Sequence, residues 1–183
     1  IEEKLIAVPS KCRPGTVKEK KWIVVHETGN YDNGAGADNH ATYLANLAKR
    51  NDTYLSWHYT VDDKKIIRHV PDNEVTWNAG DGTTEGGGNY AGISIEICVN
   101  PDSNYSVALE NAASLVADLM REHNLPLSSV KQHHDFSTNG KNCPKELRDR
   151  GLWNDFVASV GRYYAKVETE GEVATVPKTK FKV

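Results

Sequence analysis

The segment from Ile93 to Val99 alternates between apolar and polar residues, which is the pattern of a β-strand with two different faces. One face carries Ile93, Ile95, Ile97 and Val99, and the other carries Ser94, Glu96 and Cys98. A carboxylate buried in such a strand costs several kcal/mol unless it is paired or lies near a cation. The segment therefore predicts a sheet in which Glu96 lies beside a metal ion or a lysine.

Further strands are expected on both sides of this segment. Runs of β-forming residues occur at 22–26, 57–61, 65–70 and 129–132, and the second and third of them predict a hairpin around the turn at 62–64. The segment from Trp77 to Gly92 is rich in Gly, Asn, Asp and Thr, so it is expected to be a surface loop, mobile and lying over a cleft.

Apolar residues at helical spacing predict three longer helices, at 39–49, at 106–123 and from Trp153 onward, with a brief helix after Pro144. Asp38 and Ser106 are the expected N-caps of the first two long helices. The inner face of the first helix is expected to carry Tyr43, Leu44 and Leu47.

Strands that alternate with helices indicate an α/β protein, a single domain with a central mixed β-sheet flanked by helices. This domain is expected to span residues 1–166. Residues 167–183 lack apolar periodicity, and we expect a C-terminal linker or tail that leads to a further module.

The loop from His133 to Cys143 combines two imidazoles, an ammonium group and a thiol, and Pro144 ends it. Zinc favours thiolate and imidazole ligands, so the loop predicts part of a metal site. Neighbours on an extended segment point to opposite sides, so only one of His133 and His134 can face a site that Cys143 also reaches. Spacing alone does not choose between them. His26, alone at a strand end, is more often a structural histidine, but its place at the mouth of a core strand makes it a candidate ligand.

Composition excludes several other classes of protein. The net charge of −3 gives no basic face for nucleic acid, and no apolar run approaches the ~20 residues that cross a bilayer. Cys12, Cys98 and Cys143 cannot all pair, and we read them as reduced thiols, with Cys98 as a small buried residue. The N-terminus has no basic-then-apolar pattern, which predicts that the chain carries no secretion signal of its own.

Four segments, in this order, resemble a known family: the zinc-dependent N-acetylmuramoyl-L-alanine amidases of phage endolysins, bacterial autolysins and peptidoglycan recognition proteins. The segments are residues 22–30, 56–63, 92–98 and 140–144, and the resemblance spans residues 5 to 165. It implies the family fold, with a central mixed sheet, helices on it and a surface groove across the zinc.

The resemblance also implies a ligand set for Zn2+: His26, His133 and Cys143. Relatives read His-x-x-x-Ser-Gly-Lys-x-Cys, whereas this chain inserts Thr138 and Asn139. Allowing for the insertion makes His133 the match and leaves His134 as the fallback.

The implied reaction is hydrolysis of the amide bond between muramic acid and L-alanine in bacterial peptidoglycan. Three protein ligands leave a position for water, whose pKa falls to about 7 in such sites. Glu96 is expected to move the proton from water to the leaving amine, and Lys141 to stabilise the oxyanion. Some relatives place a tyrosine where this chain has Trp57, so the proton transfer falls to Glu96.

Two other functions compete with this reading. A non-catalytic peptidoglycan-binding module is disfavoured by the ligand cysteine, and a cysteine peptidase that uses Cys143 would survive zinc removal. The expected setting is a phage lysin, made in the host cytoplasm without a signal peptide and acting on the cell wall as a monomer, with a cell-wall-binding module after residue 183. A secreted autolysin is the alternative.

Overall fold

The computed structural model describes the backbone of residues 1–175 and the side chains of residues 1–166. A six-stranded sheet has the order β1-β4-β3-β5-β2-β6. Its strands are β1 (Glu2–Glu3), β2 (Trp22–Glu27), β3 (Tyr59–Val61), β4 (Ile66–Arg68), β5 (Gly92–Ile97) and β6 (Val130–Gln132). Only the β3–β4 hairpin pairs antiparallel among these strands. The sheet is therefore mixed, as the sequence predicts.

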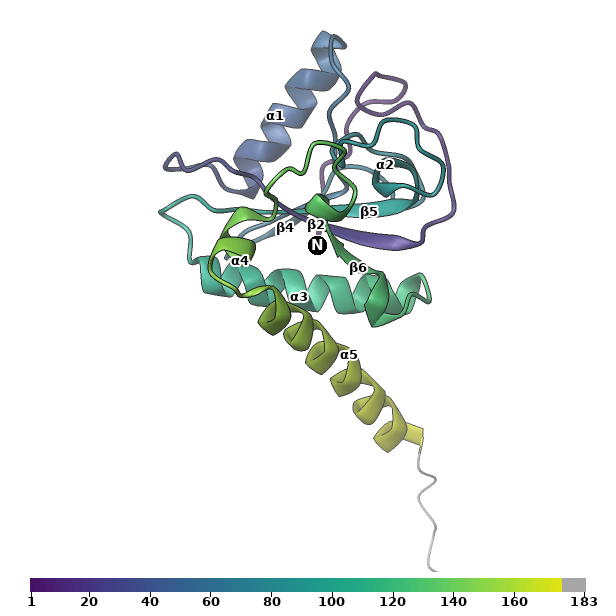
Figure 1. The fold of residues 1–183 in the computed structure, drawn as a ribbon, viewed down its shortest axis with the longest axis vertical. Coiled ribbons are helices and arrows are strands. Elements are labelled where there is room, and N and C mark those ends of the chain that lie inside the picture. The colour runs from purple at the N-terminus through teal and green to yellow at the C-terminus, as the bar shows by residue number, and fades with distance from the viewer. Residues whose placement is uncertain (176–183) are drawn as a thin grey trace, which may run out of the picture.

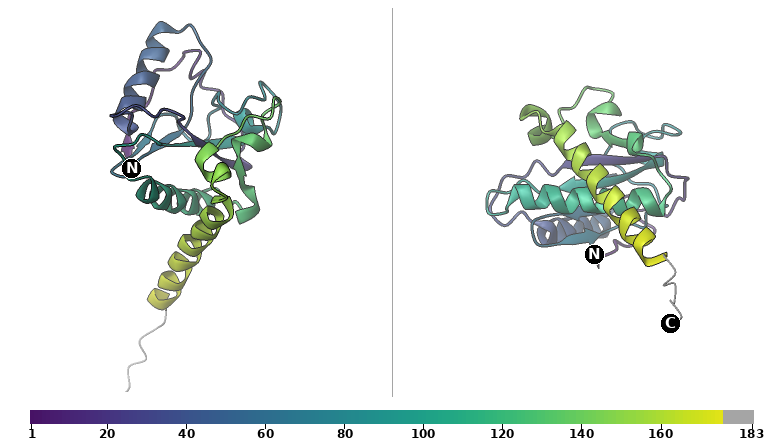
Figure 2. Two further views of the ribbon diagram at one scale, coloured as in Figure 1. Left: turned by 60° about the vertical axis from the view of Figure 1, so that its left-hand side comes forward. Right: turned by 90° about the horizontal axis from the view of Figure 1, so that it is seen from below.

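Helices cover both faces of the sheet (Figure 1). Helix α1 (Ala37–Arg50) lies on one face, and α3 (Tyr105–Glu122) lies on the other, with α5 (Trp153–Thr175) packed against α3 (Figure 2). The short elements are α2 (Gly88–Ala91), α4 (Lys145–Asp149), η1 (Leu127–Ser129) and η2 (His133–Asp135). None of the described helices combines the length and apolar character that a membrane span requires.

The main core lies between the sheet and α3. The odd-numbered residues of β2 and β5 point into it, together with apolar side chains of α3, and the largest are Ile23, Ile93, Ile95, Ile97, Leu115 and Leu119. The even-numbered residues therefore point to the opposite face, on the side of α1. The predicted alternation of 93–99 is confirmed for the residues of β5, and Glu96 lies on the polar face.

Two expectations for helix α1 are wrong. Asp38 does not cap α1: the N-cap is Gly36, and Asp62 of the β3–β4 turn accepts a hydrogen bond from the N–H of Ala37 at 2.8 Å. Tyr43 is 44% exposed and not on the inner face, whereas Leu44 and Leu47 are buried.

Asn104, rather than Ser106, caps α3, because its side chain accepts from the N–H of Val107 at 3.3 Å. The loop after Trp77 contains the short helix α2. The side chain of Asp81 accepts from the N–H of Gly88, and the side chain of Asn89 accepts from the N–H of Ala79. Helix α5 continues to Thr175, beyond the expected start of the tail, and residues 176–183 lie outside the described chain.

Candidate metal centre

Parallel pairing brings His26 and Glu96 side by side. His26 of β2 is the register partner of Glu96 of β5. On its other side, Glu96 is paired with Thr60 of β3. Strand β6 ends next to β2 and leads directly into η2, which begins with His133. Because the carboxyl ends of these parallel strands meet at one edge of the sheet, residues far apart in the sequence converge there.

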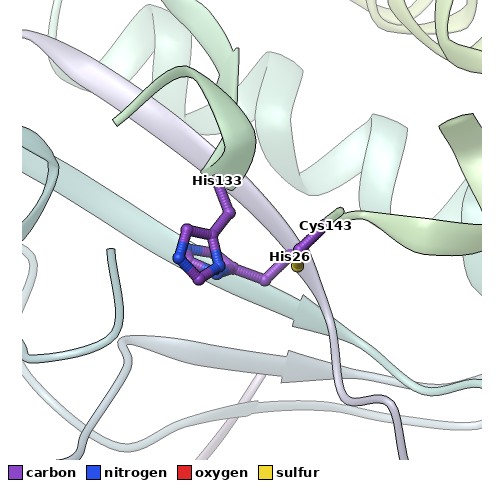
Figure 3. A group of neighbouring side chains, drawn as sticks. All are labelled: His26, His133 and Cys143. Carbon is purple, nitrogen blue, oxygen red and sulfur yellow. The ribbon is translucent and has the colours of Figure 1, made fainter. Parts of the chain in front are cut away.

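Three potential ligands lie together at this edge (Figure 3). The Nδ1 atoms of His26 and His133 are 3.0 Å apart, and the Sγ atom of Cys143 lies within 4.8 Å of both histidines' ligand atoms. All three side chains are buried. His134 lies outside the group, because its Nδ1 atom is 3.0 Å from the carbonyl oxygen of Lys141. The structure thus brings together the three residues that the resemblance selects.

The chemistry of these side chains fits a divalent metal. Burial lowers the pKa of His133 to about 4 and lowers the pKa of His26 well below its usual range, so both rings are neutral at pH 7 and have lone pairs to offer. Burial raises the pKa of the Cys143 thiol to about 12, although a backbone hydrogen bond from Glu27 opposes this. A thiolate therefore needs a cation beside it, and two imidazoles with a thiolate are ligands that zinc prefers.

Glu96 lies against this group. Its Oε1 atom is 3.8 Å from Nδ1 of His26 and accepts a hydrogen bond from Nδ2 of Asn78 at 3.2 Å. Burial raises the pKa of the carboxyl to about 7, while the Asn78 hydrogen bond and the charge of Lys141 lower it. A carboxyl with a pKa near neutrality can both accept and return a proton at physiological pH.

A cleft with a volume of about 440 Å³ opens over the group. Lys141 lines it, and α1 contributes Asn39, His40 and Tyr43 to its wall. A second hollow of about 390 Å³ shares Asn78, His133 and Lys141 with the cleft and continues past Tyr54 and Trp77. The three possible ligands therefore line the cleft, and His133 also lines the neighbouring hollow. Two adjacent depressions suit a long substrate better than a small molecule.

The loop that carries Lys141 is held at its base. The N–H of Lys141 donates to Oγ of Ser137 at 3.2 Å, and the inserted Thr138 donates from Oγ1 to the carbonyl of Gly80 at 3.3 Å. The insertion thus lies at the rim of the second hollow, where it leaves His133 and Cys143 close together.

Two of the three members of a second group of possible ligands already have protein partners. Asp72, Glu122 and His123 lie close together, but the carboxylate of Asp72 accepts from the hydroxyl of Tyr59 at 2.6 Å and pairs with Arg68 at 3.2 Å. His123 contacts its other oxygen at 3.1 Å. We read this group as a structural network.

Three residues of the site were not assigned from the sequence. His40 lines the cleft, and Asn78 contacts Glu96. The carboxylate of Glu27 accepts from the N–H groups of Glu146 at 2.6 Å and Leu147 at 3.2 Å, which ties β2 to the segment after Cys143. Glu27 could have been identified from the sequence, because it is a second carboxylate, besides Glu96, in a strand expected to be buried, and it directly follows His26.

Comparisons with known proteins all give the same family. A family model described as N-acetylmuramoyl-L-alanine amidase matches residues 16–146. The amidase XlyA of Bacillus subtilis (strain 168) is 45% identical over 161 residues, which cover 88% of this chain and 51% of that protein. The chain thus spans about half the length of this curated relative.

Solved structures agree with this. The catalytic domain of XlyA superposes with a TM-score of 0.79 at 43% identity, covering 87% of this chain and 97% of that one. The Drosophila peptidoglycan recognition protein SD shares the fold, with a TM-score of 0.53 at 16% identity over 75% of this chain and 83% of that one.

Proposed function

The chain belongs to the N-acetylmuramoyl-L-alanine amidase family, and from this premise we propose that it hydrolyses the amide bond between N-acetylmuramic acid and L-alanine in bacterial peptidoglycan. The observation that carries the proposal is the buried group of His26, His133 and Cys143 with the carboxyl of Glu96 beside it, at the floor of an open cleft.

We assign His26, His133 and Cys143 as the ligands of a zinc ion. When bound, zinc supplies a Lewis acid that polarises the amide carbonyl and lowers the pKa of water. The three side chains come from β2, η2 and the loop before α4, and these segments converge at one edge of the sheet. Three protein ligands are typical of a catalytic rather than a structural site.

Glu96 carries the proton in this scheme. Its carboxylate accepts a proton from the attacking water and passes it to the leaving amine of L-alanine. The Asn78 amide holds one carboxylate oxygen at 3.2 Å, which restricts the orientation of the group. No covalent intermediate on the protein is needed.

Lys141 lies in the wall of the cleft and is exposed. We propose that its ammonium group stabilises the negative charge that develops on the amide oxygen. Lys141→Met is expected to lower kcat about 100- to 1000-fold, the usual loss for one oxyanion donor, with zinc content unchanged. Amine release from purified cell walls measures kcat. Lys145→Met is the matched control, since Lys145 is exposed and pairs with Asp149. Equal kcat in the two variants would remove Lys141 from the mechanism.

Removal of metal separates this proposal from a cysteine peptidase. Dialysis against a chelator is expected to abolish activity, and stoichiometric Zn2+ is expected to restore it, because three ligands remain to rebind the ion. Cys143 is only 6% exposed, which suits a ligand better than a nucleophile that must reach a peptide. Activity that survives metal removal, yet is lost on thiol alkylation, would favour the peptidase.

Mass spectrometry of digested peptidoglycan tests the bond assignment directly. The expected products are glycan strands with free lactyl carboxyl groups and stem peptides with a new N-terminal L-alanine. Cleavage within the stem peptide, or between sugars, would contradict it.

We further propose that the chain acts on the wall as a monomer after synthesis in a bacterial host cytoplasm, and that a cell-wall-binding module accompanies it in the whole protein.

A further inference from the structure

One buried side chain, Asn89 of α2, organises the loop beside the possible metal site. Its Oδ1 atom accepts from the N–H of Asn78 at 2.9 Å and from the N–H of Ala79 at 2.8 Å. Its Nδ2 atom donates to the carbonyl of Gly82 at 3.0 Å. The side chain is 4% exposed, so these hydrogen bonds form away from water, where losing one is costly.

The two residues that Asn89 holds each reach a different part of the site. Asn78 donates from Nδ2 to Oε1 of Glu96 at 3.2 Å. Ala79 leads directly into Gly80, where a Cβ atom would lie 3.5 Å from Nε2 of His133, so the backbone at 79–80 lies against the ring of that histidine. Asn89 therefore contacts neither the proposed base nor a proposed ligand. Asn78 links it to Glu96, and Ala79 links it to the segment beside His133.

Glycines make this arrangement possible. A Cβ atom on Gly88 would lie 2.6 Å from Cβ of Ala79 and 2.9 Å from Cγ of Phe136, so α2 packs on Ala79 without any spacer. Gly80 has a φ of +77°, which turns the chain directly after Ala79 in a conformation that favours glycine. In the segment from Trp77 to Gly92, which was expected to be a mobile surface loop, these glycines let the side-chain amide of Asn89 reach the backbone N–H groups of Asn78 and Ala79.

We propose that Asn89 is a positioning residue of the metal centre, which acts on Glu96 through Asn78 and on His133 through Ala79. The inference rests on the proposed function, since it assigns a role within that site. A group that orients a metal ligand from outside typically contributes 10- to 100-fold in affinity or activity.

Asn89→Ala removes all three hydrogen bonds. We expect the Kd for Zn2+ to rise about 10- to 100-fold and kcat to fall by a similar factor, with little change in KM. Competition with a chromogenic chelator measures the Kd on the folded full chain, and amine release from cell walls gives kcat and KM. If this variant does not fold, Asn89→Gln replaces it, because it keeps the amide and displaces it by one methylene.

Asn89→Asp separates positioning from stability. Its carboxylate can still accept from Asn78 and Ala79, but an oxygen then faces the carbonyl of Gly82 in place of a donor. We expect a lower Tm with a Zn2+ Kd and a kcat near those of the wild type. Asn100→Ala is the matched control, because Asn100 is 5% exposed and bonds to Asp102, away from the lining of the cleft. It is expected to lower Tm and leave the Kd unchanged.

The inference is overturned if Asn89→Ala, or Asn89→Gln in its place, binds Zn2+ and turns over as the wild type does. It is also overturned if Asn89→Asp loses Zn2+ affinity in proportion to its loss of Tm, since the effect is then general destabilisation. Failure of the proposed function looks different: the wild type itself would bind no Zn2+ or release no amine.

Discussion

Cys143→Ser is expected to release zinc and abolish amide hydrolysis. A serine hydroxyl ionises far less readily than a thiol, so the variant leaves two neutral imidazoles to hold the ion. Zinc binding of roughly 10–16 kcal/mol, divided among about four ligands, puts the loss near 2.5–4 kcal/mol, which is on the order of 100- to 1000-fold in Kd. Metal analysis after gel filtration and amine release from cell walls measure the two effects.

The chain offers a matched control for this change. Cys12 is also buried, and its Sγ atom lies 3.5 Å from the carbonyl oxygen of Thr53. It packs in one cluster with Leu55 and Trp57, which line the cleft, but it does not line the cleft itself. Cys12→Ser keeps a group that can donate there, so zinc content and kcat are expected to stay at wild-type values. Full zinc content in Cys143→Ser would show that sulfur does not bind the metal, and the ligand assignment would fail.

Glu96→Gln is expected to keep zinc and lose most activity. The amide has nearly the volume of the carboxylate and its oxygen can still accept from Asn78, but it cannot take up a proton from water. General acid–base groups contribute about 100- to 10,000-fold, so we expect kcat to fall by that factor while the Kd for Zn2+ changes little. Thermal stability is expected to hold, because the substitution removes a buried ionisable group.

Glu74→Gln tests whether any buried carboxyl has this effect. Glu74 is 9% exposed and pairs with Arg13 through two hydrogen bonds of 2.7 Å. Its replacement is expected to lower Tm, since a buried arginine loses its partner, and to leave kcat of the folded protein unchanged. If Glu96→Gln lyses cell walls at the full rate, Glu96 is not the proton carrier.

The strands were predictable because their signals are local. Alternation in 93–99 sets which side chains of β5 face α3, and the apolar run at 22–26 identifies β2. The start of α1 was less predictable because a distant residue supplies the acceptor: Asp62, not Asp38, accepts from the first N–H of the helix. A cap supplied across the fold leaves no trace in the neighbouring sequence.

The choice between two adjacent histidines shows the same limit. If His133 and His134 lay on an extended segment, their side chains would point in opposite directions, but the pattern does not say which of the two would face the site. The structure places both in the 3₁₀ turn η2, which Asp135 closes by accepting from the N–H of Gln132 at 2.9 Å. Successive side chains in such a turn differ by about a third of a revolution, and the turn directs His133 inward and His134 toward the carbonyl of Lys141.

By itself, the sequence determined the class of fold, the chemical types of the possible ligands and the face of β5 on which Glu96 lies, because periodicity and side-chain chemistry are local properties. Residue spacing left His133 and His134 open and the motif match selected His133, but only the tertiary structure showed that His133 lies beside His26 and Cys143. It alone also showed that Asn78 contacts Glu96 and that Asn89 holds the backbone of Asn78. Those relations depend on parallel strands placing their carboxyl ends at one edge of the sheet, where β2, β5 and η2 meet through contacts between residues that are distant in the chain.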